Sequence, residues 1–264
     1  MKEYIIERPI GLTSLCEEVD RICQKAEAYR HGARLRHLIV QMDRGNGRTT
    51  YLEYLTEMFK KHKILDFTCS RDDYLELDLD ASSPSGVAYM FSAIDEAAVY
   101  DNEYSNVVGI DVSDMARHLG TLQDRIFITG VKKLCKTAFV VFFIGSSPTG
   151  DEEKLIEGII KAVGSDRLKR LRADPYSGKE ICELIKKMVT EHDIHIQDDP
   201  KMMDALENLA FIASLRTVQD AENMTDVLIH AADYSGLVPS IGVDTVLPLV
   251  MEWGFDEGER TEMR

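Results

Sequence analysis

Hydrophobic residues follow two spacings along the first part of the chain, and each spacing predicts a different element. Apolar residues three or four apart predict amphipathic helices, and short runs rich in branched or aromatic side chains predict strands. The expected helices cover residues 12–29, 48–64, 85–100 and 113–135, and the expected strands cover residues 35–42, 75–79, 106–112 and 138–145. Strands that alternate with helices are typical of a parallel sheet with helices on both faces. The pattern therefore predicts an α/β fold.

The character of the chain changes after a turn-rich stretch at residues 174–178. From residue 179 to residue 233 we find only helical spacing, and residues 243–251 have the pattern of one more helix. The sequence therefore predicts three parts, which are an amino-terminal helical segment, an α/β domain and a helical domain with a carboxyl-terminal tail. Their expected bounds are residues 1–30, 31–176 and 177–264.

Charge and composition narrow the classes of function. The 264 residues include 31 Lys and Arg against 46 Asp and Glu, which gives a formal net charge of −15. So acidic a surface repels nucleic acid and anionic lipid, so neither is an expected partner. No apolar run approaches the ~20 residues of a membrane-spanning helix. The beginning of the sequence has no apolar signal core, and we expect a cytoplasmic protein.

A glycine-containing loop between an expected strand and an expected helix is the main candidate for chemistry. Such a loop can direct backbone N–H groups and a helix amino terminus at a phosphate. Against the P-loop pattern GxxxxGK[ST], a glycine and a threonine match, but methionine replaces the first glycine and arginine replaces the lysine. The candidate cofactor-binding residues are Asp43, Arg44, Gly45, Asn46, Gly47, Arg48, Thr49 and Thr50. Taken alone, the loop is equally consistent with an ordinary turn.

The order of motifs around this loop resembles AAA+ proteins of the CbxX/CfqX (SpoVK-like) type, the group that contains the red-type Rubisco activases. The segment Pro9–Val19 is similar to the start of that family, His37–Val40 and Gly45–Thr50 match its first strand and P-loop, and Asp174–Ser177 resembles the beginning of its helical lid. The resemblance extends from about residue 9 to residue 233. It implies an AAA+ nucleotide-binding domain followed by a lid, ATP or ADP with Mg²⁺ as cofactors, and Gly11 and Leu12 among the residues that contact the nucleotide.

The family's second acidic motif is an apolar strand that ends in Asp-Glu. Here the expected strand over residues 106–112 supplies Asp111, but the next residue is Val112. The resemblance therefore makes Thr49 and Asp111 the candidate magnesium ligands, with no glutamate to polarise water. Asp95 and Glu96 are an alternative pair, although the residues before them have helical spacing.

Three further positions match the family's catalytic residues. Ser146 corresponds to the first sensor, Arg167, in preference to Arg170, corresponds to the arginine finger, and Arg216 corresponds to the second sensor. Each also has a simpler interpretation: Ser146 as a capping serine, Arg167 as part of a solvated basic edge, and Arg216 as a surface arginine. Together with Asp111, these are the candidate catalytic residues.

The departures at two catalytic positions bear on function. Arg48 is wider than lysine and prefers bidentate contacts, so it cannot take the lysine's place without a shift of the loop. We therefore expect an AAA+ protein with a degenerate nucleotide site that forms a ring with itself or with an active paralogue and acts on a protein client. Two alternatives remain open, which are an active ATPase that remodels a client and uses Asp95 and Glu96, and a scaffold that needs no nucleotide.

Overall fold

The computed structural model describes residues 6–31, 33–65, 74–77, 89, 91–94, 107–118, 121–236 and 238–251. The chain forms two compact units, residues 1–173 and 174–264. The boundary expected from the sequence falls between residues 176 and 177.

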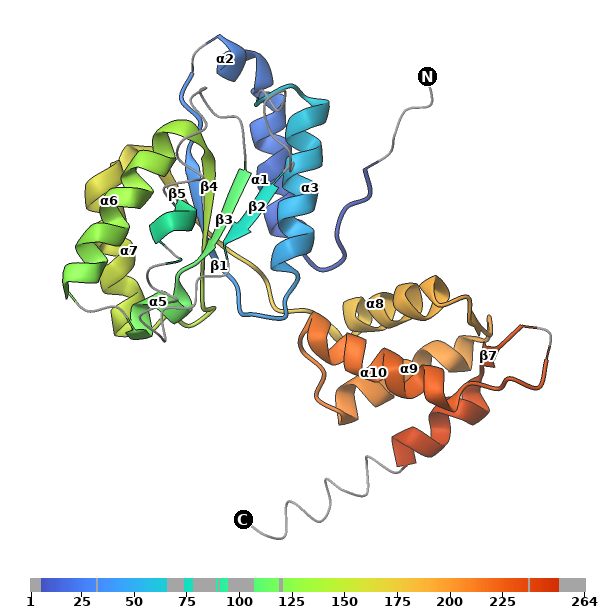
Figure 1. The fold of residues 1–264 in the computed structure, drawn as a ribbon. Helices are drawn as coiled ribbons and strands as arrows, with labels where there is room; N and C mark the ends of the chain where they lie inside the picture. The colour runs from blue at the N-terminus through green and yellow to red at the C-terminus, as the bar shows by residue number, and fades with distance from the viewer. Residues whose placement is uncertain are drawn as a thin grey trace. The chain divides into compact units, whose positions relative to one another are not determined.

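A five-stranded sheet forms the centre of the first unit (Figure 1). Its strands are β1 (His37–Gln41), β2 (Tyr74–Leu77), β3 (Val107–Asp111), β4 (Phe139–Ile144) and β5 (Leu168–Arg172). They lie in the order β2-β3-β4-β1-β5, and every neighbouring pair is parallel. Because parallel strands end at one edge of a sheet, the residues that follow β1, β3 and β4 meet there.

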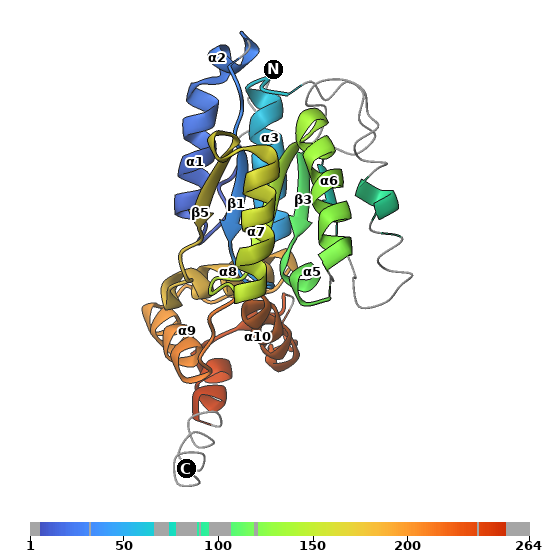
Figure 2. The same cartoon turned by 90° about the vertical axis from the view of Figure 1, so that its left-hand side faces the viewer.

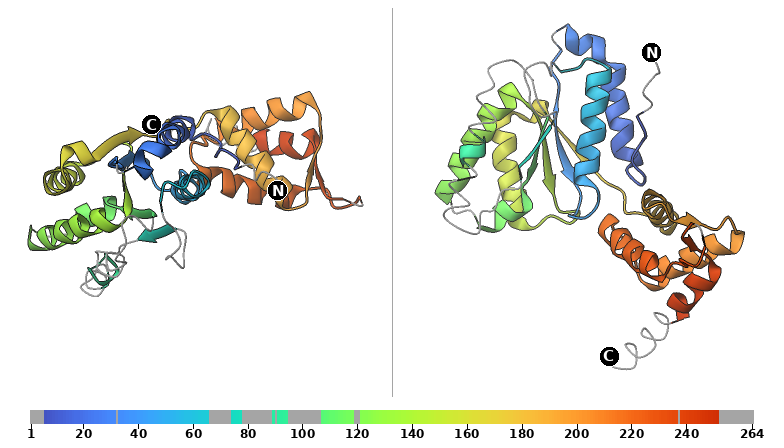
Figure 3. Two further views of the ribbon diagram at one scale, coloured as in Figure 1. Left: turned by 90° about the horizontal axis from the view of Figure 1, so that it is seen from above. Right: turned by 45° about the vertical axis from the view of Figure 1, so that its right-hand side comes forward.

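Helices cover both faces of this sheet, as the two turned views show (Figures 2 and 3). One face carries α1 (Thr13–Gln24) and α3 (Arg48–Lys61), with the short α2 (Ala26–Arg30) after α1. The other face carries α5 (Ser113–His118), α6 (Thr121–Thr137) and α7 (Gly150–Val163), and the 3₁₀ turn η2 (Ser165–Arg167) leads into β5. The layers are those that the alternating pattern predicts.

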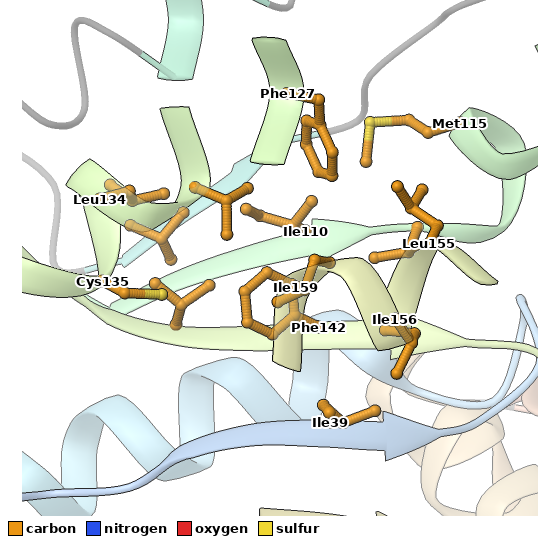
Figure 4. Packing of buried hydrophobic residues seen from close by; sticks show 14 of the residues in the cluster. Ile39, Ile110, Met115, Phe127, Leu134, Cys135, Phe142, Leu155, Ile156 and Ile159 are labelled. Carbon is orange, nitrogen blue, oxygen red and sulfur yellow. The ribbon is translucent and has the colours of Figure 1, made fainter. Parts of the chain in front are cut away.

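The core under α5, α6 and α7 is made of side chains from one face of the strands (Figure 4). Ile39, Ile110 and Phe142 point from the sheet toward Phe127 of α6 and Ile156 of α7. All are at most 1% exposed, so this side of the sheet is sealed from water. Burial of such side chains contributes about 1.5–3 kcal/mol each, and it fixes the positions at which the strands end.

The opposite face brings α3 close to the strands. A Cβ atom at Gly109 of β3 would come within 2.5 Å of the Leu52 Cδ1 atom of α3 and 3.3 Å of the Phe143 ring. Phe59 of α3 meets Phe139 edge to face, with ring centroids 5.0 Å apart. The glycine thus allows the helix after the loop to rest directly on β3.

The second unit consists mainly of helices. They are α8 (Gly178–Glu191), α9 (Pro200–Ile212), α10 (Val218–Ala231) and a last helix over residues 243–251. Ser177 and Thr217 begin α8 and α10 with capping boxes, and Asp199 caps α9. These caps satisfy N–H groups in the first turns of the three helices and fix where each helix begins.

Most predicted elements of the first unit are confirmed, but some details of the prediction differ. The expected helices over residues 12–29 and 113–135 are each two helices, and the basic stretch expected to carry the arginine finger continues into a strand, β5. The expected all-helical unit also contains the short parallel strands β6 (His195–Ile196) and β7 (Ser240–Ile241). Of the expected helix over residues 85–100, only residues 89 and 91–94 are described, and they are helical.

Candidate nucleotide-binding site

The loop after β1 has the backbone geometry of a phosphate cradle. Gly45 and Gly47 adopt the left-handed region, with φ of 78° and 81°, which glycine reaches without steric cost. Gly47 also stands at the N-cap of α3, where it has no side chain to cap the helix. The first turn of α3 contains no acidic residue. The partial positive charge of the helix amino terminus is thus available to an anion.

Arg48 turns inward beneath this loop. Its Nε atom donates to the Met42 carbonyl at 3.1 Å, its Nη2 atom donates to the same carbonyl, and its guanidinium lies over the Phe143 ring, 5.3 Å from the centroid. Its Nη1 atom forms an ion pair with Asp111 Oδ2 at 2.6 Å. The Arg48 side chain is 8% exposed and that of Asp111 is 11% exposed, so the pair is buried.

Asp111 receives three donors at the end of β3. Oδ2 accepts from Arg48 and also from Arg44 Nε at 2.7 Å, and Oδ1 accepts from the Ser113 N–H at 3.0 Å. Burial acts to raise the pKa of Asp111, but the Arg48 charge and the hydrogen bonds from Arg44 and Ser113 outweigh it and hold the pKa below its usual range. The carboxylate is therefore ionised and occupied by groups of the chain itself.

A second polar link joins the loop to the end of β4. Asp43 Oδ1 accepts from the Ser146 N–H at 2.8 Å, and Oδ2 accepts from the Ser146 hydroxyl at 2.5 Å. The hydrogen bond from that hydroxyl lowers the pKa of Asp43. Ser146 does lie at the carboxyl edge of the sheet, as the sensor prediction requires, but its hydroxyl is engaged with the loop.

Two positions near the end of β3 bear on whether a carboxylate can orient the attacking water. Val112 is fully buried in the core, and its N–H donates to the Phe143 carbonyl at 2.8 Å. The nearby Glu152 of α7 accepts from the Gly145 N–H at 3.2 Å and from the Thr149 N–H at 2.6 Å. Burial acts to raise the pKa of Glu152, but these hydrogen bonds, that from Thr149 first, lower it overall. Glu152 thus caps a helix, and it is no substitute for the missing glutamate.

The predicted arginine finger lies at the other end of the strands from the loop, where the parallel strands begin. Arg167 ends the turn before β5, and its Nη2 atom donates to the Cys135 carbonyl at 2.9 Å. The alternative Arg170 pairs with Glu153, with the Arg170 Nη1 atom 3.1 Å from a Glu153 oxygen. Both arginines are thus bonded within their own chain.

The remaining predicted residues are spread around the loop and beyond it. Thr49 and Thr50 are exposed at the start of α3. Gly11 has φ of 74° just before the buried Leu12, which precedes α1. Arg216 belongs to the second unit, where it is exposed and donates from Nη1 to the Leu215 carbonyl at 3.1 Å. The alternative pair Asp95 and Glu96 lies outside the described residues, although the helical residues 91–94 precede it directly.

Sequence reasoning did not find the contacts of Arg44 and Glu152. Arg44 is 67 residues from its partner Asp111, and no spacing rule joins positions so far apart. The capping box of Thr149 and Glu152 has the S/T-x-x-E pattern and could have been found. Within the described ranges, no three His, Cys, Asp or Glu side chains gather closely enough to hold a metal ion.

These residues fit the polyphosphate of a magnesium nucleotide but not its metal ion. The left-handed glycines and the amino terminus of α3 fit a polyphosphate. The end of β3 does not fit a magnesium ion, because both oxygens of Asp111 already accept hydrogen bonds from the chain.

Comparison with known proteins identifies the fold. No family model and no curated protein matches the sequence, whereas many solved structures match. The Holliday junction branch migration motor RuvB of Thermotoga maritima has 16% identity and a TM-score of 0.56, and the match covers 92% of this chain and 70% of RuvB. PCH-2 of C. elegans has 13% identity and a TM-score of 0.59, with 92% and 68% covered.

A third match is Hsp104, whose structure contains ATPγS and casein. It has 14% identity and a TM-score of 0.56, and the match covers 92% of this chain and 42% of Hsp104. No helix in the described part of this chain is long and apolar enough to cross a bilayer. The strand order, the loop after β1 and these likenesses agree, and the chain has the AAA+ P-loop fold.

Proposed function

We propose that this chain is a nucleotide-binding AAA+ protein whose own site hydrolyses ATP weakly, and that it acts as a subunit of a ring or as a regulator of an active paralogue. The observation that carries the proposal is the buried ion pair between Arg48 and Asp111. It joins the residue in the lysine position to the residue in the magnesium-ligand position. Neither is then placed to act on the terminal phosphate.

Binding is supported by features that do not depend on those two side chains. The cradle is made of backbone, with Gly45 and Gly47 in the left-handed region, and the α3 amino terminus faces it. Backbone N–H groups and a helix dipole are sufficient to attract a phosphate. A polyphosphate chain can therefore be held even where catalytic side chains are absent.

Weak hydrolysis is supported at two further positions. Val112 supplies no carboxylate to orient water, and the Ser146 hydroxyl is bound to Asp43. Loss of one positioned acid or base typically removes ~10²–10⁴-fold in rate.

The family resemblance and the fold favour a partner of the same class, and the net charge of −15 disfavours nucleic acid. Lys169 and Arg170 on β5 also pair with Glu18 and Glu153, which leaves little basic surface there.

The test is to measure binding and turnover on the same preparation. Calorimetry with ATP and ADP should give saturable binding at one site per chain. Steady-state turnover should stay below about 0.01 per second, roughly 10²-fold under the low end of ordinary enzyme rates. Fast turnover by the unaltered chain would contradict the weak-hydrolysis half, and the absence of binding would contradict the other half.

Assembly needs a separate measurement. Light scattering of the pure chain, with and without ATP, reports whether it forms a ring alone. Mixing with an active AAA+ paralogue should change that paralogue's ATPase rate if this chain is a regulatory subunit. No change in mass and no change in any paralogue's rate would contradict the proposed role. The role does not require Arg167 to act across an interface, since Arg167 is bonded to Cys135 of its own chain.

A nucleotide-independent scaffold is the second candidate, and a specific observation favours it. The loop is already fixed at both ends by Asp43–Ser146 and by Arg44 and Arg48 on Asp111, so its shape does not require a phosphate. Thermal unfolding with and without ATP separates the two candidates, because a ligand that binds only the native state must raise the unfolding temperature. An unchanged midpoint at millimolar ATP would favour the scaffold.

A further inference from the structure

We propose that Arg48 and Arg44 are resident cations that replace a divalent metal at Asp111, so that the loop binds ATP and ADP without Mg²⁺. The inference rests on the proposed function, since it concerns how the same loop holds nucleotide. It goes beyond that function because weak hydrolysis alone would leave binding dependent on magnesium.

The geometry of Asp111 supports the substitution of metal by arginine. A magnesium-binding carboxylate offers lone pairs to the ion or to its water shell. Here Oδ2 accepts from Arg44 Nε at 2.7 Å and lies 2.6 Å from Arg48 Nη1, while Oδ1 accepts from Ser113 N–H at 3.0 Å. The two guanidinium groups thus occupy one oxygen of the carboxylate, and the Ser113 N–H occupies the other.

Displacement of Arg48 by a metal would be costly. Its side chain is 8% exposed, and it also bonds the Met42 carbonyl and lies over the Phe143 ring. A metal that took Asp111 would leave this guanidinium buried beside a second cation. Breaking a buried ion pair is among the larger single penalties in proteins, and here it corresponds to a loss of about 10²–10³-fold in metal affinity.

The position of Arg44 shows how a resident cation could reach a ligand. Its side chain is 54% exposed, in contrast to that of Arg48, and it belongs to the loop itself. Together the two arginines balance the charges of Asp43 and Asp111, so the loop needs no metal to offset its own carboxylates. An incoming phosphate then meets the helix terminus and an exposed guanidinium instead of a metal ion.

The first experiment compares ATP affinity in excess Mg²⁺ with ATP affinity in EDTA, by calorimetry on the full chain. We expect the two dissociation constants to agree within about threefold. A dissociation constant at least tenfold lower in Mg²⁺ would overturn this inference and leave the proposed nucleotide binding intact. Absence of binding in both buffers would overturn both, so the two failures are distinguishable.

The second experiment asks whether one substitution weakens or tightens ATP binding. In a metal site, Asp111→Asn removes a ligand of magnesium and weakens Mg-ATP binding. With resident cations, the same change releases positive charge from its partner, and we expect ATP binding in EDTA to tighten by about threefold or more. The matched control is Asp151→Asn on α7, an exposed carboxylate paired with Lys154, which should change neither constant. Weaker binding by Asp111→Asn in Mg²⁺ alone would overturn the inference.

Arg44→Gln keeps the test decisive if Asp111→Asn does not fold. It removes the exposed guanidinium and leaves the buried pair of Arg48 and Asp111 in place. We expect ATP binding in EDTA to weaken about three- to tenfold and the ratio between Mg²⁺ and EDTA to rise, with an unchanged circular dichroism spectrum. An unchanged affinity and an unchanged ratio would overturn the role of Arg44.

Discussion

The two edges of the central sheet hold buried polar groups in different ways. At the carboxyl edge, Arg48 and Asp111 neutralise each other. At the amino edge, His37 of β1 accepts from the Val140 N–H at Nδ1, and Arg167 donates to the Cys135 carbonyl. The first edge therefore depends on ionised partners, and the second depends on a histidine that stays neutral.

Because of this difference, we expect the two edges to lose stability at different pH values. Burial lowers the pKa of His37 to about 4, and the nearby Arg167 charge acts in the same direction. The pKa values of Asp43 and Asp111 are also below their usual range, but the groups are acids. Their stabilisation is present above pH ~4 and is lost as pH falls through their folded-state values. Acid should thus weaken the amino edge first and the carboxyl edge afterwards.

The largest effect is expected from breaking the buried pair. Arg48→Ala leaves Asp111 without its buried partner and should reduce the free energy of unfolding by about 3–5 kcal/mol, measured by urea denaturation at pH 7. Arg170→Ala is the control, because its ion pair with Glu153 is 38% exposed on each side and should contribute no more than about 1 kcal/mol. Equal losses in the two variants would contradict the comparison.

The second effect is the acid response of the amino edge. The unfolded chain protonates His37 near pH 6.5, but the folded chain does so only near 4, so stability falls as pH falls between these values. Between pH 7 and pH 4.5 the loss attributable to His37 should be about 2–3 kcal/mol. His37→Gln can retain the hydrogen bond from Val140 and should remove that part of the slope. A slope that persists in the variant would assign the response to another group.

A smaller effect tests the backbone of the cradle. Gly47→Ala forces a Cβ atom into the left-handed region and should cost about 1–2 kcal/mol, together with weaker ATP binding. Gly178→Ala at the start of α8, where an added Cβ meets nothing within 4 Å, should be neutral or stabilising by about 0.5–1 kcal/mol. Thermal unfolding and calorimetry measure both. A loss as large at Gly178 would show that strain in the loop is not the cause.

The smallest effect sharpens the role of the second link at the carboxyl edge. Ser146→Ala removes the hydroxyl that donates to Asp43 but keeps the backbone N–H bond, so we expect a loss of about 0.5–1.5 kcal/mol at pH 7. The loss should shrink as pH falls through the lowered pKa of Asp43 and the carboxylate protonates. Ser147→Ala, at the exposed neighbouring position, should have no effect. A loss that is independent of pH would rule out the carboxylate as the partner.

The sequence was most informative where the hydrophobic pattern is strong. The fully buried β4 and the helix after the loop lie within a few residues of their predicted bounds. β5 was not recognised, because it lies at the edge of the sheet and only Leu168 among its five residues is buried. β6 and β7 are two residues long, which is too short for any alternation to register.

The candidate site was predictable in its backbone and not in its side-chain pairing. The glycines of the loop and the position of Asp111 follow from local patterns. The direction of Arg48 does not, because it depends on Met42, Asp111 and Phe143, which meet only after β1, β3 and β4 align. The sequence leads us to expect that Arg48 shifts the loop; in the structure its guanidinium bonds the Met42 carbonyl and Asp111.

The two links that fasten the loop also set the entropy of any binding event. Backbone that becomes ordered when a ligand arrives costs about 1–2 kcal/mol for each residue. Asp43 is already anchored to Ser146, and Arg44 and Arg48 are anchored to Asp111. The loop is therefore ordered when the chain folds, and binding does not have to order it again. An anion that reaches this loop should therefore be captured without a slow rearrangement step, and the observed association rate should rise linearly with its concentration.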